Sequence, residues 1–230
     1  MFDIKKAIKI AQYSDIIYKE YGGDMEDALA ELNVHEYKYV ARKDTQALIV
    51  FDHEKKEMYL IYRGTKGIND WKTDANCHIV NMAWGGVHQG VLEAEEAVRR
   101  DIDTILTYEQ YKDYQLWVGG HSLGSGIATE AAIRLATTTE VHIAGVYTFG
   151  SMRVFNKIGV ATYNHLLGAL TFRVVHGCDM VTFMPAQLKE VDTLVYISHK
   201  GKVFVKGTDN MWADKLKDGF LNSLSFGLFT

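Results

Sequence analysis

A single serine in a glycine-bounded turn is the clearest candidate for chemistry in this sequence. Gly120-His121-Ser122-Leu123-Gly124 forms a G-x-S-x-G pattern between the apolar run Leu116–Val118 and a helically spaced stretch, Ser122–Ala136. A tight strand-to-helix turn exposes the serine hydroxyl, and the flanking glycines allow strand and helix to approach closely. N–H groups at the helix start, beginning with that of Leu123, favour negative charge on an attacked carbonyl. The pattern predicts Ser122 as a nucleophile and Leu123 as an oxyanion donor.

A serine nucleophile needs a histidine to accept its proton and a carboxylate to orient that histidine. On a strand–turn–helix scaffold of this kind the order along the chain is serine, acid, histidine, each after a strand. Asp179 follows the predicted strand Thr171–His176 by three residues, and His199 directly follows the predicted strand Val191–Ser198. The spacing therefore selects Asp179 as the acid and His199 as the base.

Three further polar residues near these strands receive different interpretations. Thr65 follows the predicted strand Glu57–Tyr62 and is expected to supply the second oxyanion donor. His176 precedes the acid, so we interpret it as a core or supporting histidine. His121 is expected to face away from Ser122 and to hydrogen-bond within the core.

The elements that must position these residues alternate between strands and helices along the chain. The expected helices are Asp3–Tyr21, Met25–Leu32, Val87–Leu106, Ser122–Ala136 and a stretch near Phe155–Leu167. Further strands are expected over Gln46–Phe51, which forms a hairpin with Glu57–Tyr62, and over His142–Phe149 and Lys202–Val205. Lys66–Ala83 is expected to be an irregular connector, and the charges of Val87–Leu106 (Glu93, Glu95, Glu96, Arg99 and Arg100) are interpreted as a solvated face. This alternation predicts an α/β sandwich with a mainly parallel sheet and an antiparallel hairpin at one edge.

Composition narrows the class of protein. With 230 residues and 47% hydrophobic content, one domain spanning residues 1–230 is expected. The net charge of −4 comes without a basic stripe, so no nucleic-acid partner is expected. Cys77 and Cys178 are interpreted as reduced thiols. Charged residues interrupt Met1–Gly23, and no run of 18 apolar residues occurs, so neither a signal peptide nor a transmembrane segment is predicted. A cytoplasmic location is expected, with export by another route left open.

Several blocks in a fixed order resemble the class 3 lipase family of α/β-hydrolases over about residues 46–205. They are Tyr62-Arg63-Gly64-Thr65, Asp70-Trp71 with Asp74, Gly86-Val87-His88-Gln89-Gly90, Gly120-His121-Ser122-Leu123-Gly124, Tyr147-Thr148-Phe149-Gly150, Phe172-Arg173-Val174-Val175-His176 with Asp179, and Tyr196-Ile197-Ser198-His199-Lys200-Gly201. The resemblance implies an α/β-hydrolase fold: a mostly parallel central sheet flanked by helices.

The resemblance also implies roles for individual residues. Ser122 is the implied nucleophile, Asp179 the acid, His199 the base, and Thr65 and Leu123 the oxyanion donors. A lid that controls substrate access is implied within Lys66–Ala83, where Trp71 is the candidate for substrate or lipid contact. One departure from the family pattern is Ser125, which stands where a second glycine usually follows Leu-Gly and is expected to alter packing at the turn slightly.

The expected function is hydrolysis of carboxylic esters of glycerol or similar lipids through a Ser-His-Asp acyl-enzyme. A phospholipase A1 and a short-chain carboxylesterase are alternatives, and a non-catalytic lipase-like binding module is an alternative of another class. No metal or organic cofactor is expected, since the His, Asp and Glu residues lack ligand spacing. The partner is a lipid or small ester, with transient lipid-interface contact left open. For the apolar tail Phe220–Phe229, docking on the sheet is favoured over contact with lipid or a partner.

Overall fold

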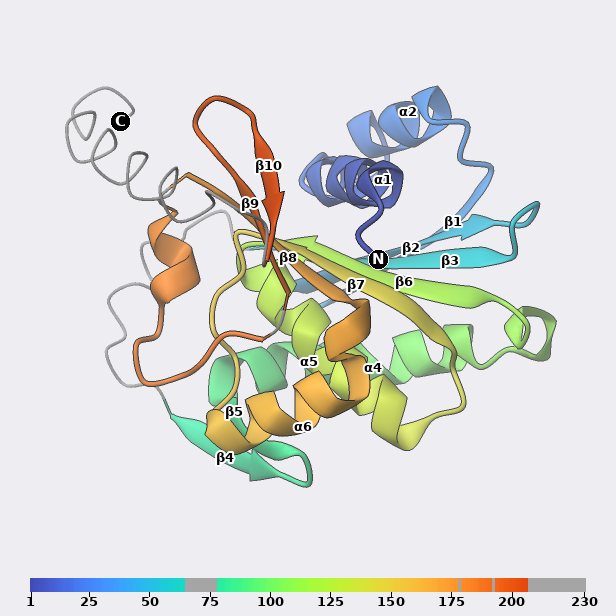
Figure 1. Ribbon diagram of the computed structural model, residues 1–230. Helices are drawn as coiled ribbons and strands as arrows, with labels where there is room; N and C mark the ends of the chain where they lie inside the picture. The colour runs from blue at the N-terminus through green and yellow to red at the C-terminus, as the bar shows by residue number, and fades with distance from the viewer. Residues whose placement is uncertain (65–77, 178, 192, 207–230) are drawn as a thin grey trace.

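A mixed sheet of eight strands runs through the part of the chain that the computed structural model describes, residues 1–64, 78–177, 179–191 and 193–206 (Figure 1). Neighbouring strands follow the order β1-β2-β3-β6-β7-β8-β9-β10. The bounds are β1 Glu36–Arg42, β2 Thr45–Asp52, β3 Glu57–Tyr62, β6 Gln115–His121, β7 Ile143–Phe149, β8 Thr171–His176, β9 Thr193–Ile197 and β10 Val203–Val205.

The middle of this sheet is parallel, as the sequence predicts. Strands β3, β6, β7, β8 and β9 pair in parallel, with Tyr62 opposite Gly120 and His121 opposite Phe149. Antiparallel strands lie at both edges, β1 and β2 at one and β10 at the other. The expected antiparallel hairpin, β2–β3, is confirmed, but the edge strand β1 beyond it was not predicted.

Helices cover both faces of the sheet (Figure 1). On one face lie α1 Ile4–Ile16 and α2 Asp24–Glu31, and on the other lie α4 Gln89–Leu106, α5 Leu123–Thr138 and α6 Lys157–Leu167. Single 3₁₀ turns occur at η1 Glu109–Tyr111, η2 Gly168–Leu170 and η3 Met180–Phe183. Because both faces are covered, all six residues of β3 are buried, as expected of a central parallel strand.

Some predicted elements have different bounds in the structure. Helix α1 ends at Ile16 rather than continuing to Tyr21. Helix α4 begins at Gln89 because β5 Gly85–His88 pairs with β4 Ile79–Met82, so part of the expected irregular connector is a small antiparallel sheet. Helix α6 begins at Lys157, since the backbone of Phe155 forms bridges with Val87 and Lys189.

The expectation that all five charges on α4 are solvated is wrong for Glu95. Its side chain is fully buried and accepts a hydrogen bond of 2.7 Å from Nε of Arg134 on α5. The Arg134 guanidinium also makes a bidentate pair with Asp103, at 2.8 and 3.1 Å. Burial raises the pKa of Glu95, although the neighbouring Arg134 charge opposes that rise. This buried ion pair joins α4 to α5 beneath the sheet.

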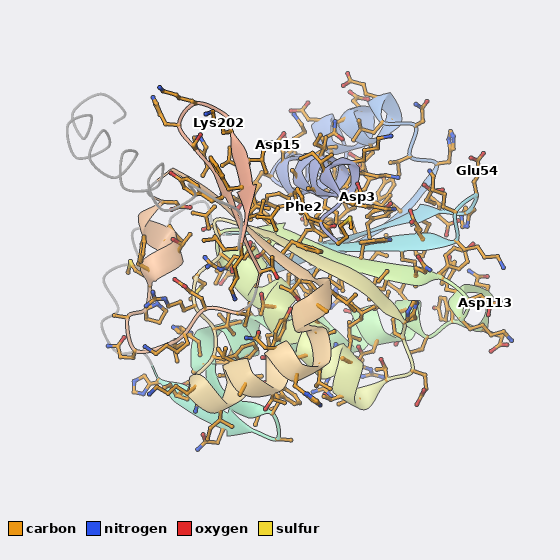
Figure 2. All side chains as sticks on the ribbon, viewed as in Figure 1. Phe2, Asp3, Asp15, Glu54, Asp113 and Lys202 are labelled. Carbon is orange, nitrogen blue, oxygen red and sulfur yellow. The ribbon has the colours of Figure 1, made fainter. Side chains whose placement is uncertain are left out.

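The candidate site residues lie at one end of the parallel strands. Glu54, in the turn before β3, and Asp113, before β6, lie together at the end of the sheet where these strands begin (Figure 2). The carboxyl ends of β3, β6, β7, β8 and β9 therefore meet at the opposite end. In open α/β sheets, sites are built at that end.

Candidate active site

Ser122 occupies a strained turn between β6 and α5. Its φ angle is +57° and its ψ angle −124°, values that a residue other than glycine rarely adopts. The N–H of Ser122 donates to the carbonyl of Phe149 on β7, at 2.9 Å, and its carbonyl accepts from the N–H of Ser125, at 3.0 Å. Ser122 is only 4% exposed, and Leu123 is the first residue of α5. This is the strand–turn–helix geometry predicted for a nucleophilic serine.

Close backbone packing explains why a glycine, Gly124, stands two residues after Ser122. A Cβ atom on Gly124 would lie 2.2 Å from the carbonyl oxygen of Tyr62, at the end of β3. The same strand end brings Gly64 beside the turn, because a Cβ there would lie 3.5 Å from Cβ of Ser122. The chain that leads into Thr65 thus passes next to Ser122. Thr65 itself, the expected second oxyanion donor, lies outside the described residues.

Asp179 lies in the loop after β8, close to the loop after β7. A Cβ atom on Gly150 would lie 2.6 Å from Oδ2 of Asp179 and 3.8 Å from Nε2 of His121. The other carboxylate oxygen, Oδ1, accepts a hydrogen bond from the N–H of Val181, at 3.0 Å. The Asp179 carboxylate is therefore held beside the residue that precedes Ser122.

His199 lies in the turn between β9 and β10, next to the Asp179 loop. The N–H of Gly177 donates to the carbonyl of Ile197 at 3.0 Å, and Asp179 and His199 each follow two residues later. Ser198 closes the histidine turn, because its Oγ accepts from the N–H of Lys202 at 3.1 Å. The His199 side chain is exposed. The two loops thus lie side by side at the same end of the sheet.

The core placement that was expected for His121 and considered for His176 is wrong. His176 is exposed at the end of β8 rather than buried in the core, because it is the last residue of its strand. His121 is exposed as well, and its Nδ1 lies 3.2 Å from the hydroxyl of Tyr18, which follows α1. Partial desolvation lowers the pKa of His121, although the charges of Asp179 and Asp15 oppose that change.

Tyr18 is a feature of the site that the sequence reasoning missed. The Tyr18 hydroxyl reaches the loop after β3, since a Cβ on Gly64 would lie 2.3 Å from it. Burial raises the pKa of Tyr18, while the N–H of Gly64 and the charge of Arg63 oppose that rise. The spacing of Tyr18 within an apolar helix pattern gives no local signal of this contact.

Some predicted positions cannot be placed. Residues 66–77 of the expected lid, which include Trp71 and Cys77, lie outside the described residues, as do Cys178 and the apolar tail. In the described part of the chain, no group of three His, Cys, Asp or Glu residues could hold a metal ion. The helices there are also too short or too polar to cross a bilayer.

The described arrangement is suited to acyl transfer. A serine hydroxyl at the start of a helix, a carboxylate beside that turn and a histidine in the adjacent loop meet at one end of the sheet. The N–H of Leu123, the first residue of α5, has no preceding helical carbonyl as a partner, so it is available to a developing oxyanion.

Comparison with known sequences identifies related proteins. The sequence model of the family Lipase (class 3) matches residues 59–189. The chain is 34% identical over 146 residues to the secreted mono- and diacylglycerol lipase 1 of Fusarium solani, covering 60% of this chain and 42% of that protein. It is 33% identical over 150 residues to the secreted mono- and diacylglycerol lipase A of Penicillium cyclopium, covering 62% and 47%. The chain thus spans about half the length of the curated relatives it matches.

A solved structure of a triacylglycerol lipase, described as having a serine protease triad at its catalytic centre, has the same fold. Its TM-score is 0.74 at 22% sequence identity, and the match covers 90% of this chain and 85% of that one. The expected α/β-hydrolase fold is therefore confirmed.

The names of the sequence relatives contradict the expected cytoplasmic location. Both lipases are named as secreted, which points to an extracellular protein. The expectation depended on the composition of residues 1–23, and that composition does not determine the compartment in which a protein works.

Proposed function

Because the chain belongs to the class 3 lipase family, we propose that it is an extracellular serine hydrolase that cleaves acyl esters of glycerol. The observation that carries the proposal is the strained backbone of Ser122, with φ +57°, between β6 and α5. Strain of this kind costs on the order of 1–3 kcal/mol and clusters at active sites, where surrounding contacts over-determine it. The secreted mono- and diacylglycerol lipases among the relatives support acylglycerols as the substrate class.

In the proposed mechanism, Ser122 Oγ attacks the ester carbonyl carbon while His199 accepts the hydroxyl proton. Asp179 holds the imidazole and stabilises its positive charge. The N–H groups of Leu123 and Thr65 bind the oxyanion. Collapse of the tetrahedral intermediate breaks the bond to the glycerol oxygen, which takes the proton from His199 and leaves as an alcohol.

The second half of the cycle releases the fatty acid. His199 removes a proton from water, the resulting hydroxide attacks the acyl-enzyme carbonyl, and the Ser122 ester bond breaks. Ser122 recovers its proton from His199, so the residues return to their starting state. We propose Trp71 as a substrate-contacting residue of a lid over this site.

Hydrolysis of a matched set of substrates tests the proposal. The full chain is assayed on p-nitrophenyl esters of increasing acyl length, on emulsified diacylglycerol and triacylglycerol, and on phosphatidylcholine vesicles. We expect acylglycerol hydrolysis that Ser122→Ala reduces to a residual rate roughly 10³-fold above water. Ser14→Ala, which removes a buried hydroxyl from α1, is the control and should retain activity.

Other outcomes identify other functions. Preferred hydrolysis of phosphatidylcholine would indicate a phospholipase A1, and turnover of short soluble esters alone would indicate a carboxylesterase. An absence of turnover, together with no labelling of Ser122 by an organophosphonate, would overturn the proposal in favour of a binding module.

A further inference from the structure

We propose that the Ser125 hydroxyl is a positioning group for the nucleophile, which it holds through the backbone of Gly120 and Phe149. The inference rests on the proposed function, since it concerns how the same hydrolase site is kept in its reactive geometry. Ser125 lies in the first turn of α5, and its side chain is completely buried.

The hydroxyl bridges two neighbouring strands. Ser125 Oγ lies 2.5 Å from the carbonyl oxygen of Gly120 on β6 and accepts a hydrogen bond from the N–H of Phe149 on β7, at 3.1 Å. The carbonyl of Phe149 lies 3.0 Å from the same oxygen, but it already accepts the N–H of Ser122. Because a hydroxyl has one hydrogen to donate, we assign it to the shorter contact, with Gly120.

These two backbone groups face each other in the sheet. His121 is paired with Phe149 in a parallel ladder, so the N–H of Phe149 points toward the carbonyl of Gly120. The Ser125 hydroxyl is located at this pairing, the last one before the turn. It joins the end of β6, the end of β7 and the start of α5.

The bridged groups are the ones that restrain Ser122. Ser122 is bonded through its N–H to Phe149 and through its carbonyl to the N–H of Ser125. A backbone with positive φ is maintained only where surrounding contacts over-determine it. Loss of the Ser125 hydroxyl leaves the N–H of Phe149 and the carbonyl of Gly120 without this partner, so the turn can shift. A shift of about 1 Å in a reacting group costs on the order of 10²-fold in rate.

Alanine and glycine at position 125 should behave differently. Alanine removes the hydroxyl but keeps a Cβ atom between the helix and the two strands. Glycine removes both and leaves the N–H of Phe149 and the carbonyl of Gly120 with only the ladder contact that the pairing of His121 with Phe149 already gives them. Glycine is also the less favourable residue within a helix. Both variants should therefore lower kcat, and Ser125→Gly should have the lower melting temperature.

The experiment compares Ser125→Ala and Ser125→Gly with Thr129→Val in the full chain. Thr129 lies one turn further along α5, is also buried, and donates its hydroxyl to the carbonyl of Ser125, at 2.8 Å. For each variant we measure kcat and KM per active site titrated with an organophosphonate, the rate of that labelling, and the melting temperature.

We expect Ser125→Ala to lower kcat and the labelling rate about 10-fold with KM changed less than twofold. Thr129→Val should lose melting temperature with kcat unchanged. If Ser125→Ala does not fold, Ser125→Cys, which supplies only a weak donor, should show a kcat loss of the same kind.

Two results would overturn the proposed role of Ser125. A third would instead overturn the proposed hydrolase function. A kcat of Ser125→Ala within twofold of the wild type, or an equal kcat loss in Thr129→Val, would show that the hydroxyl has only a structural role. A wild-type chain that neither hydrolyses esters nor reacts with the organophosphonate would overturn the proposed function itself.

Discussion

The position that a Cβ atom of Gly150 would occupy lies 2.6 Å from Oδ2 of Asp179. Gly150 has φ +57° and follows β7, while Asp179 follows β8, so the two loops meet at this point. The carboxylate that we propose as the catalytic acid is thus packed against backbone that carries no side chain. The carboxylate can hold this position because residue 150 has no side chain.

Gly150→Ala should therefore impair catalysis and stability together. The added methyl group must displace the Asp179 carboxylate, and a shift of about 1 Å lowers kcat on the order of 10²-fold. Positive φ at alanine adds about 1–2 kcal/mol of backbone strain. Steady-state ester hydrolysis and thermal unfolding measure the two effects.

Gly22→Ala is the matched control for backbone strain. Gly22 has φ +90°, but no atom lies within 4 Å of its Cβ position, and it lies between α1 and α2. We expect a comparable stability loss with kcat unchanged. Equal kcat values for Gly150→Ala and Gly22→Ala would contradict the link between Gly150 and the acid.

Loss of the proposed base or acid should abolish most turnover without unfolding the protein. His199→Ala should match Ser122→Ala, and the double variant should be no slower, because the residues act as one unit. Asp179→Asn should lower kcat by roughly 10⁴ because the amide favours the wrong histidine tautomer. His176→Ala, at an exposed position, should retain activity. An inactive His176→Ala beside an active His199→Ala would reverse these assignments.

The local patterns of the sequence predicted the parallel core of the sheet. Strands β3 and β8 have the predicted bounds because each is a short run of buried, β-favouring residues. The turn at Ser122 was predicted because its flanking glycines are a local signal. They are needed where the strand and the helix on either side of the turn pack closely. The edge strand β1 was missed, since its charged residues dilute the apolar pattern.

Contacts between distant parts of the chain could not be predicted in this way. Glu95 resembles its solvated neighbours on α4 until Arg134, 39 residues away, is placed against it. The contact of Tyr18 with His121 spans 103 residues. In each pair, neither residue changes the hydrophobic periodicity of the sequence around the other. At the candidate site, sequence spacing could therefore select the reacting residues but not the groups that support them.

Tyr18→Phe should lower kcat with little change in KM. The variant removes a hydroxyl that lies 3.2 Å from Nδ1 of His121 and reaches the loop at Gly64. One neutral hydrogen bond is worth about 1 kcal/mol, which corresponds to roughly a fivefold loss in kcat. Tyr21→Phe is the control, because Tyr21 is exposed and stacks on Tyr39, with ring centroids 4.4 Å apart. A tenfold rise in KM at constant kcat would instead assign Tyr18 to substrate binding.

Glu130 should make the folded protein less stable as the pH rises. It is completely buried on α5, where the indole N–H of Trp84 is the donor nearest its carboxyl group. Burial, followed by the charge of Glu95, raises its pKa from 4.5 to about 8. The folded state therefore binds a proton that the unfolded state releases between these two pH values.

The sign of the effect follows from this difference in proton binding. Below pH 4.5 both states are protonated and Glu130 has no pH-dependent effect. Stability then falls through the interval up to about pH 8 and levels off above it, with a total loss on the order of 5 kcal/mol. The hydrogen bond from Trp84 and the Arg134 charge limit the loss, whereas Glu96 adds to it.

Urea unfolding of Glu130→Gln across this pH range tests the prediction. The amide has nearly the same shape and cannot ionise, so the fall in stability due to Glu130 should disappear and the variant should exceed the wild type above pH 8. Glu93→Gln, at an exposed position on α4, should keep the wild-type slope. Glu130→Gln could instead lose stability with pH as steeply as the wild type. That result would show that Glu130 is already ionised in the folded protein.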